Sequence, residues 1–409
     1  MGDERDIVAR ARELDPELRT SVLCATQEVG RVRDFTKHAR VVVLDDRSPL
    51  EEWVAAARFV HAADTVDRVV CFGEEGQRTA AAIADELRLV WHSGGTVRAV
   101  DSKWHMRQRL TEAGVDDTPC VLASTAEEIA VFGTRAGYPL ICKPAGGVGS
   151  QGVVRLDDAD DIAGRLATTL AAAAALPNGD VLVEPFHAGR EYSVECLSED
   201  GRHLALCVTE KFLAPGGFVE VGHVLPARLA EGEEQRILST VTAALDALGI
   251  REGVNHTEVI VTEHEVRVVE THLRQAGDRI PYLLRDARGV DIVDALARQS
   301  IGLGALDGVR AQVEKAAVDG RFGAIWYATP SAAGEVLEVR GVEDVKGRPG
   351  ISDAVVRVAR GDRVQPITSS ASRPAHVWGV ADTPDEALSL VRQAVADLEF
   401  VVAVPGGGT

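Results

Sequence analysis

The chain has 409 residues, 45% of them apolar, and its 63 Asp and Glu residues outnumber its 44 Lys and Arg residues to give a formal net charge of −19. This length exceeds what one hydrophobic core usually serves, so we expect a globular protein of about two or three domains. A surface of this sign repels phosphodiester backbones, which argues against nucleic acid as a partner.

The cysteines and the first residues of the chain indicate the cellular compartment in which the protein is expected. The six cysteines form no C-x-x-C pair, which favours a reducing environment. The opening stretch MGDERDIVARARELD is charged and has no apolar segment typical of a secretion signal. No apolar run approaches the roughly 20 residues that cross a membrane. We therefore expect a cytoplasmic protein with no membrane partner.

Residues 1 to about 100 alternate between strand-like and helix-like segments. Strands are expected at 21–24, 40–44 and 66–72, and helices at 50–62 and 77–87. This alternation predicts a parallel sheet covered by helices.

Capping residues mark the next two helices. Ser102 can cap a helix over 103–113, and Lys103 lies in its first turn. The capping box Ser124–Glu127 opens a second helix, which extends to residue 136. Taken alone, Lys103 is most simply a solvated surface lysine.

A glycine-rich loop follows the strand that ends in Lys143. The run PLICKPAGGVGSQG, residues 139–152, leads into a second strand at 153–156. Glycine lets backbone N–H groups approach an anion, and a lysine on the entering strand can neutralise phosphate charge. The spacing matches neither G-x-x-x-x-G-K-[ST] nor G-x-G-x-x-G. The pattern favours a phosphate-binding loop, and the alternative is a flexible surface hairpin.

A strand at 181–186 breaks at Pro185 and restarts at 189–195. Such a break frees backbone groups that can bind the edge of an adenine, and Glu191 could accept ribose hydroxyls. The alternative is a surface bend with a solvated glutamate.

Two acids lie on strands that read as a hairpin. The strands 257–262 and 266–270 flank residues 263–265. A three-residue loop pairs Glu258 with Glu270 and puts both carboxylates on one face, whereas a two-residue turn would separate them. Two facing carboxylates favour Mg²⁺ or Mn²⁺, and the alternative is two solvated strand acids. Arg274 then stands where it can meet an anionic intermediate.

The order of these motifs resembles the ATP-grasp superfamily over about residues 1–300. The resemblance implies two α+β lobes that clamp ATP, with a glycine loop over the β- and γ-phosphates and Mg²⁺ or Mn²⁺ on two acids, which Glu258 and Glu270 match. The ATP-binding residues that it implies are Lys103 and Lys143 at the phosphates, Gly146, Gly147, Gly149, Ser150 and Gly152 in the loop, Glu184 and Phe186 at the adenine, and Glu191 at the ribose.

One position departs from the family pattern. Family members read E-x-N-x-R at the second acid, and this chain reads E-T-H-L-R. His272 therefore stands where the family has asparagine. It either binds the metal as a neutral imidazole or lies outside the metal's ligands.

A shorter motif resembles the L-amino-acid ligases of the bacilysin-synthetase type. It is E-V-G-H at 220–223 followed by Pro226, and residues from about 318 to 398 resemble the C-terminal domain that these ligases share with biotin carboxylase. The resemblance implies that Glu220 holds a substrate ammonium. His223 would donate to a substrate oxygen or shuttle a proton, and Arg274 would bind substrate and stabilise the acyl phosphate.

The expected fold class is α/β and α+β in three domains. These are an N-terminal parallel α/β domain at 1–100, an ATP-grasp domain at 101–305 with its small lobe at about 115–187, and a β-rich C-terminal domain at 306–409 that packs on the large lobe. The resemblance also implies a homodimer.

The expected activity is an ATP-dependent ligation. ATP phosphorylates a small-molecule carboxylate, an amine (an amino acid) attacks the acyl phosphate, and an amide or dipeptide leaves with ADP and phosphate. Two alternatives stay open: a carboxylase of the biotin or aminoimidazole-ribotide kind, which activates bicarbonate, and a non-catalytic ATP-binding module.

Overall fold

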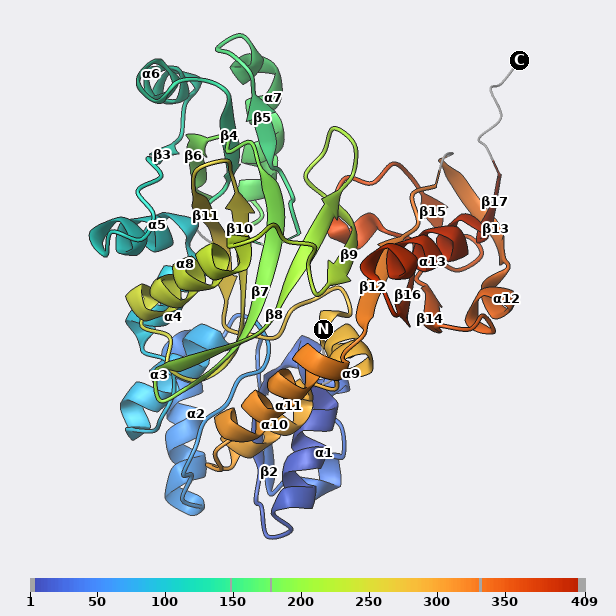
Figure 1. Ribbon diagram of the computed structural model, residues 1–409. Coiled ribbons are helices and arrows are strands. Elements are labelled where there is room, and N and C mark those ends of the chain that lie inside the picture. The colour runs from blue at the N-terminus through green and yellow to red at the C-terminus, as the bar shows by residue number, and fades with distance from the viewer. Residues whose placement is uncertain (1–3, 148, 177–178, 331–332, 404–409) are drawn as a thin grey trace.

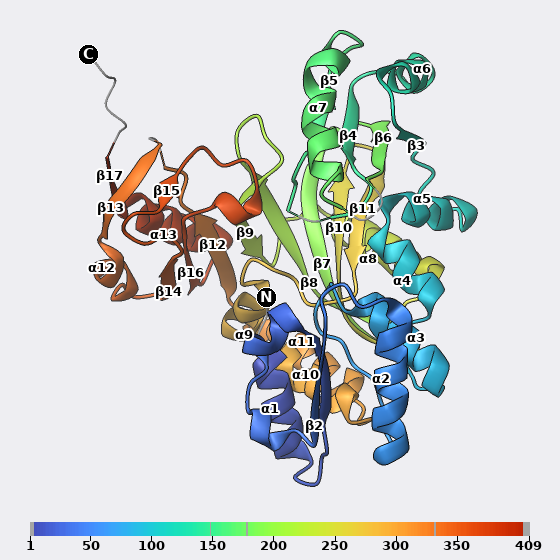
Figure 2. The ribbon, with the colours of Figure 1, turned by 180° about the vertical axis from the view of Figure 1, so that it is seen from behind.

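The structure is a computed structural model that describes residues 4–147, 149–176, 179–330 and 333–403. Val148, in the glycine loop, lies outside the described residues. The strands form sheets of two, eight, three and four strands. Figures 1 and 2 show the four-stranded sheet, with α6 and α7, at one end of the long strands β7 and β8, and the N-terminal helices at the other end.

The N-terminal part combines a small sheet with helices. β1 and β2 pair in parallel, as expected, and α2 and α3 form close to the predicted ranges. Its elements are α1 (Glu4–Leu14), β1 (Ser21–Ala25), β2 (Arg40–Leu44), α2 (Leu50–Ala63), α3 (Gln77–Leu87), α4 (Gly94–Asp101) and α5 (Lys103–Glu112), with short 3-10 turns at Thr26–Arg31 and Phe35–Lys37.

The strand expected at 66–72 is wrong, because these residues are irregular and join no sheet. The side-chain amide of Gln77 donates to the carbonyls of Cys71 and Gly73, at 3.1 and 2.8 Å. A side chain therefore supplies hydrogen bonds at the end of this segment, where a neighbouring strand was expected to supply them.

The small lobe is a four-stranded antiparallel sheet in the order β3-β6-β4-β5. The capping box of α6 is Thr125 with Glu128, one residue later than predicted. The elements are β3 (Val121–Ala123), α6 (Ala126–Ala136), β4 (Leu140–Pro144), β5 (Val154–Leu156), α7 (Asp161–Ala173) and β6 (Val181–Pro185). A core that includes Ile129, Leu140 and Leu166 joins both helices to the sheet.

The large sheet is antiparallel and runs in the order β11-β10-β7-β8-β9-β12-β16-β14. The sheet includes strands from both sides of the domain boundary predicted at residue 305, because β12 pairs with β9. Its strands are β7 (Arg190–Glu199), β8 (Arg202–Leu213), β9 (Glu220–Leu225), β10 (Gly253–Val261), β11 (Val266–His272), β12 (Phe322–Tyr327), β14 (Ile351–Val356) and β16 (Ala375–Ala381).

Helices and a smaller sheet complete the chain. They are α8 (Glu233–Leu248), α9 (Ile280–Arg288), α10 (Ile292–Ser300), α11 (Leu306–Asp319), β13 (Gly334–Arg340), α12 (Val342–Lys346), β15 (Arg363–Val364), the 3-10 turn η3 (Ser370–Ser372), α13 (Pro384–Ala396) and β17 (Glu399–Ala403). Among the described residues no helix is long and apolar enough to cross a membrane.

Two β-bulges set which side chains share a face of the large sheet. In the β10–β11 hairpin, Val261 pairs with Val266 and Val259 with Val268, but Glu258 pairs with Glu270, which leaves Val269 as the extra residue. Because side chains alternate along a strand, this bulge turns Glu270 onto the face of Glu258. The expected pairing is therefore present, although the bulge produces it rather than a three-residue loop.

The second bulge lies in β9. His223 pairs with Lys211 and Gly222 with Phe212, but Leu213 pairs with Glu220, so Val221 is the extra residue. Simple alternation would place Glu220 and His223 on opposite faces. The bulge brings both onto the face that carries Lys211.

Gly222, beside the second bulge, gives a test of this packing. A Cβ at Gly222 would lie 2.1 Å from the ring of Trp326. We predict that Gly222→Ala lowers the free energy of unfolding in urea by about 1–3 kcal/mol through overpacking. The matched control is Gly164→Ala in α7, where an added Cβ meets nothing within 4 Å. It should leave the midpoint unchanged or raise it. Equal midpoints for the two variants would contradict the close contact.

Candidate active site

A cleft between the small lobe and the large sheet gathers most of the predicted residues. Its cavity volume is about 150 Å³, and its empty space is about 1,090 Å³ when open solvent is included. The predicted residues that line it are Lys103, Lys143, Gly146, Gly147, Gly149, Ser150, Glu184, Phe186, Glu191, Glu220, Glu258 and Glu270. Gly152, His223 and Arg274 do not line it. The cavity volume is below the roughly 300–1,000 Å³ usual for ligand pockets.

Lys211 lies among three glutamates on one face of the large sheet, and the sequence analysis did not predict it as a site residue. Its Nζ lies 2.7 Å from Glu258, 3.0 Å from Glu220 and 3.9 Å from Glu191, and its side chain is 2% exposed. Desolvation alone would lower the pKa of this lysine, but the three carboxylates hold it well above its usual value. The identity of these partners depends on strand pairings far apart in the sequence, so no local pattern marks Lys211.

The paired acids Glu258 and Glu270 are each balanced by a lysine and a histidine. Glu258 lies 2.7 Å from Lys211 and 3.2 Å from His256, whereas Glu270 lies 2.7 Å from Lys103 and 3.0 Å from His272. Burial alone would raise both carboxyl pKa values. The neighbouring cations outweigh it, so the pKa of Glu258 falls to about 2 and that of Glu270 falls well below its usual range.

Glu258 and Glu270 are also the acids expected to bind a metal ion. Among the described residues, no three His, Cys, Asp or Glu side chains are grouped so that they could hold a metal ion. Two facing carboxylates that line an open cleft nevertheless suit Mg²⁺, which commonly binds one or two carboxylates together with substrate phosphates. Lys103, which pairs with Glu270, also donates to the carbonyl of Gly147 at 3.1 Å.

His272 is engaged at both ring nitrogens. Its Nε2 lies 3.0 Å from Glu270 and its Nδ1 lies 2.6 Å from Glu74. Desolvation would lower the pKa of this histidine, but the two carboxylates raise it. Both ring nitrogens of His272 are therefore paired with carboxylates in this structure.

Glu74, in the loop before α3, is a second residue that sequence reasoning missed. Its carboxylate lies 2.6 Å from His272 and 2.6 Å from Nε of Arg274. Burial would raise its pKa, but His272 and Arg274 lower it to about 2. The N-terminal part of the chain therefore holds the arginine expected to meet the anionic intermediate.

Ion pairs connect the side chains in the part of the cleft around Glu184. The Glu184 carboxylate binds both Lys143 and Arg107, whose Nε lies 2.9 Å away. Burial would raise the pKa of Glu184, but these two cations lower it to about 2. Phe186, beside them, does not have the free backbone N–H expected at the strand break, since it donates to Pro139 O at 2.9 Å.

Glu191 differs from the other acids. Its desolvation, followed by its proximity to Glu258, outweighs the nearby Lys211 and raises its pKa to about 7. It is therefore partly protonated near neutral pH, where a protonated carboxyl can donate as well as accept hydrogen bonds.

Glu220 and His223 meet groups from later in the chain. Ser370 Oγ donates to Glu220 at 3.2 Å, and His223 Nε2 lies 2.8 Å from Asp278. Asp278 and Ser370 were not predicted as site residues. Gly152 lies at the base of the loop, where its carbonyl accepts from Thr169 Oγ1 at 2.7 Å.

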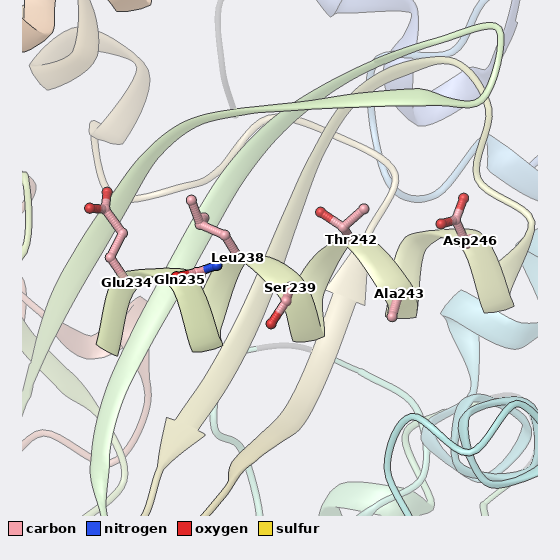
Figure 3. A pocket seen from close by; sticks show the side chains of 7 residues that line it. All are labelled: Glu234, Gln235, Leu238, Ser239, Thr242, Ala243 and Asp246. Atoms are coloured by element: carbon pink, nitrogen blue, oxygen red, sulfur yellow. The ribbon is translucent and has the colours of Figure 1, made fainter. Parts of the chain in front are cut away.

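A separate hollow of about 590 Å³ runs along α8. Figure 3 shows that its lining side chains all project from this one helix: Glu234, Gln235, Leu238, Ser239, Thr242, Ala243 and Asp246. Groups from several elements do not converge there, so the cleft remains the candidate site.

Two stretches of the chain match models of known protein families. Residues 136–282 match the family model described as ATP-grasp domain, and residues 326–403 match the one described as L-amino acid ligase C-terminal domain 2.

Individual relatives are distant but cover most of the chain. The chain is 24% identical over 420 aligned positions to Uncharacterized protein y4rH of Sinorhizobium fredii, which covers 98% of this chain and 84% of that protein. It is 25% identical to Dapdiamide A synthase of Enterobacter agglomerans, over 83% of this chain and 80% of that protein. The structure of an L-amino acid ligase from Bacillus licheniformis superposes with a TM-score of 0.80 at 21% identity, over 97% of this chain and 95% of that one.

Lys211 gives a test of the charge balance. We predict that Lys211→Met, which leaves the partly buried Glu258, Glu220 and Glu191 without their shared cation, lowers the free energy of unfolding by about 3–5 kcal/mol. Adding Glu258→Gln to that variant removes one of the uncompensated charges and should recover part of the loss. Urea denaturation measures both effects. A single variant as stable as the native chain would contradict the central role of Lys211.

Proposed function

Because the chain is an ATP-dependent ligase with an ATP-grasp fold and the second C-terminal domain of L-amino acid ligases, we propose that it joins the carboxylate of one small molecule to the amine of an amino acid. The observation that carries the proposal is the position of Lys211. Its ammonium contacts Glu258, the expected metal-binding acid, and Glu220, the expected substrate-binding acid. Triphosphate and substrate would thus meet at one buried charge.

Lys103, Lys143 and the glycine loop would bind the triphosphate. Both lysines line the cleft together with Gly146, Gly147 and Gly149. Each lysine is paired with a carboxylate in this structure, so phosphate oxygens would compete with Glu270 for Lys103 and with Glu184 for Lys143. Phe186 and Glu191 line the part of the cleft proposed for adenine and ribose.

Glu258 and Glu270 would hold Mg²⁺, which would supply positive charge to the triphosphate. The substrate carboxylate would attack the γ-phosphorus of ATP, the bond between that phosphorus and the β-phosphate oxygen would break, and ADP would leave as the acyl phosphate forms. Arg274 would stabilise the charge on this acyl phosphate and on the tetrahedral oxyanion that the amine forms. Glu220 would hold the ammonium of an amino-acid substrate.

The proposed domains each contribute to this chemistry. The N-terminal domain, 1–100, supplies Glu74 to orient Arg274, and the ATP-grasp domain, 101–305, supplies the cleft. The C-terminal domain, 306–409, supplies Ser370, whose hydroxyl donates to Glu220.

A phosphate-release screen tests the proposed function. The full chain is incubated with ATP and Mg²⁺ and with pairs of amino acids, and mass spectrometry identifies each product. We expect phosphate and ADP to form only with certain pairs, together with the corresponding amide. Bicarbonate-dependent release with no amide would favour a carboxylase. ATP binding without ADP formation across the panel would favour a non-catalytic module.

Arg274 allows a sharper test on any pair that reacts. We predict that Arg274→Ala lowers kcat by about 10²–10³, because one charge-stabilising group is lost from the transition state. The ATP dissociation constant should stay near the native value. The control is Arg285→Ala in α9, an exposed arginine that pairs with Asp286. Native turnover in Arg274→Ala would remove this residue from the mechanism.

A further inference from the structure

A short C-terminal segment, Ser369–Arg373, touches three parts of the candidate site. The N–H of Ser370 donates to Gly149 O in the glycine loop at 3.4 Å, and its hydroxyl donates to Glu220 at 3.2 Å. Nη1 of Arg373 donates to the Glu220 carbonyl at 3.1 Å. Residues some 150 positions later in the sequence thus contact Glu220, the acid proposed to bind the substrate ammonium.

Arg373 also binds Asp278 through two parallel hydrogen bonds. Nη1 and Nη2 donate to the two carboxylate oxygens at 2.8 and 2.6 Å. Arg373 is 3% exposed and lies over the ring of Tyr327, 3.7 Å from its centroid. Bidentate pairing fixes the plane of the carboxylate as well as its position.

Asp278 in turn binds His223. The Oδ2 atom of Asp278 that accepts from Arg373 lies 2.8 Å from Nε2 of His223. Asp278 and Arg279 both have left-handed backbones, with φ of 51° and 62°, which is an unfavourable conformation for residues other than glycine. The contacts to Arg373 and His223 hold Asp278 in this unfavourable conformation.

The hydrogen bond to Asp278 determines which nitrogen of His223 is free. An ionised carboxylate only accepts, so Nε2 carries the proton that it donates. His223 is 2% exposed, and its Nδ1 has no hydrogen-bond partner among the residues that the structure describes. A buried nitrogen without a protein partner is uncommon, and a catalytic role is one of its recognised explanations. The side chain of Lys211, its cross-strand neighbour, is already paired with Glu258 and Glu220.

We propose that Arg373 and Asp278 are positioning residues that lock His223 with its proton on Nε2, so that Nδ1 accepts a proton from the attacking amine. This inference rests on the proposed ligase function. The amine nitrogen forms a bond to the acyl carbon, the carbon–oxygen bond to phosphate breaks, and phosphate leaves with that electron pair. The amine proton passes to Nδ1, and the resulting imidazolium keeps its hydrogen bond to Asp278.

The tautomer is measured directly in the full chain labelled with ¹⁵N-histidine. Two-bond ¹⁵N–¹H correlation spectra at a pH where the ring is neutral identify His223 by its absence from His223→Gln. We expect a single tautomer with the proton on Nε2. Arg373→Gln and Asp278→Asn should show a mixture of tautomers, whereas Arg373→Lys should keep the native one.

The matched control is Arg357→Gln. Arg357 lies over the same Tyr327 ring, 5.9 Å from its centroid, but is exposed. Its spectrum should be native. A proton on Nδ1 in the native chain, or a native spectrum in Arg373→Gln, would overturn the proposal. If Arg373→Gln fails to fold, Asp278→Asn and Arg373→Lys decide the same question.

Turnover gives the second readout. With a reacting amino-acid pair, Arg373→Gln should lower kcat by about 10–100-fold, as loss of a residue that orients a functional histidine typically does, and leave the Michaelis constant for ATP unchanged. Combining it with His223→Gln should cost no more than His223→Gln alone. Additive losses would overturn the proposal. A native tautomer lock in a chain that forms no amide would place the failure in the proposed function rather than in the positioning.

Discussion

The structure depends on neutralising partly buried carboxylates that lie together on one face of the large sheet. Glu191, Glu220 and Glu258 share the ammonium of Lys211, and Glu270 is matched by Lys103 and His272. Buried charges persist only when they are paired, and removing one member leaves the others uncompensated. Such an arrangement is costly for stability alone. It is useful in an enzyme that exchanges these internal cations for a metal ion and for the charges of its substrates.

The backbone supplies the geometry through two irregularities. The bulge at Val269 turns Glu270 toward Glu258, and the bulge at Val221 turns Glu220 toward His223. Regular strands of the same sequence would scatter these groups over both faces. The remaining partners come from outside the cleft: Glu74 from the N-terminal part, and Ser370 and Arg373 from the C-terminal part. The site is therefore completed by all three parts of the chain.

Local sequence signals predicted the fold and much of the cleft, because glycine spacing, capping residues and alternation act over a few neighbours. They pointed to Lys143 with its loop and to the Glu258/Glu270 pair. The order of these motifs resembled the ATP-grasp superfamily, and the comparisons confirm that fold. Local signals failed where long-range contacts decide. Residues 66–72 form no strand, and Lys211, Glu74, Asp278 and Arg373 acquire their roles only from partners distant in sequence.

The central claim is that the two paired acids exist to receive a metal ion that arrives with a triphosphate. Calorimetric titration of the full chain with ATP, with and without Mg²⁺, tests it most directly when repeated on a Glu258→Gln/Glu270→Gln variant. The account predicts that Mg²⁺ strengthens ATP binding to the native chain and that this gain disappears in the variant. An equal gain in both proteins, or no effect of Mg²⁺ on the native chain, would contradict it.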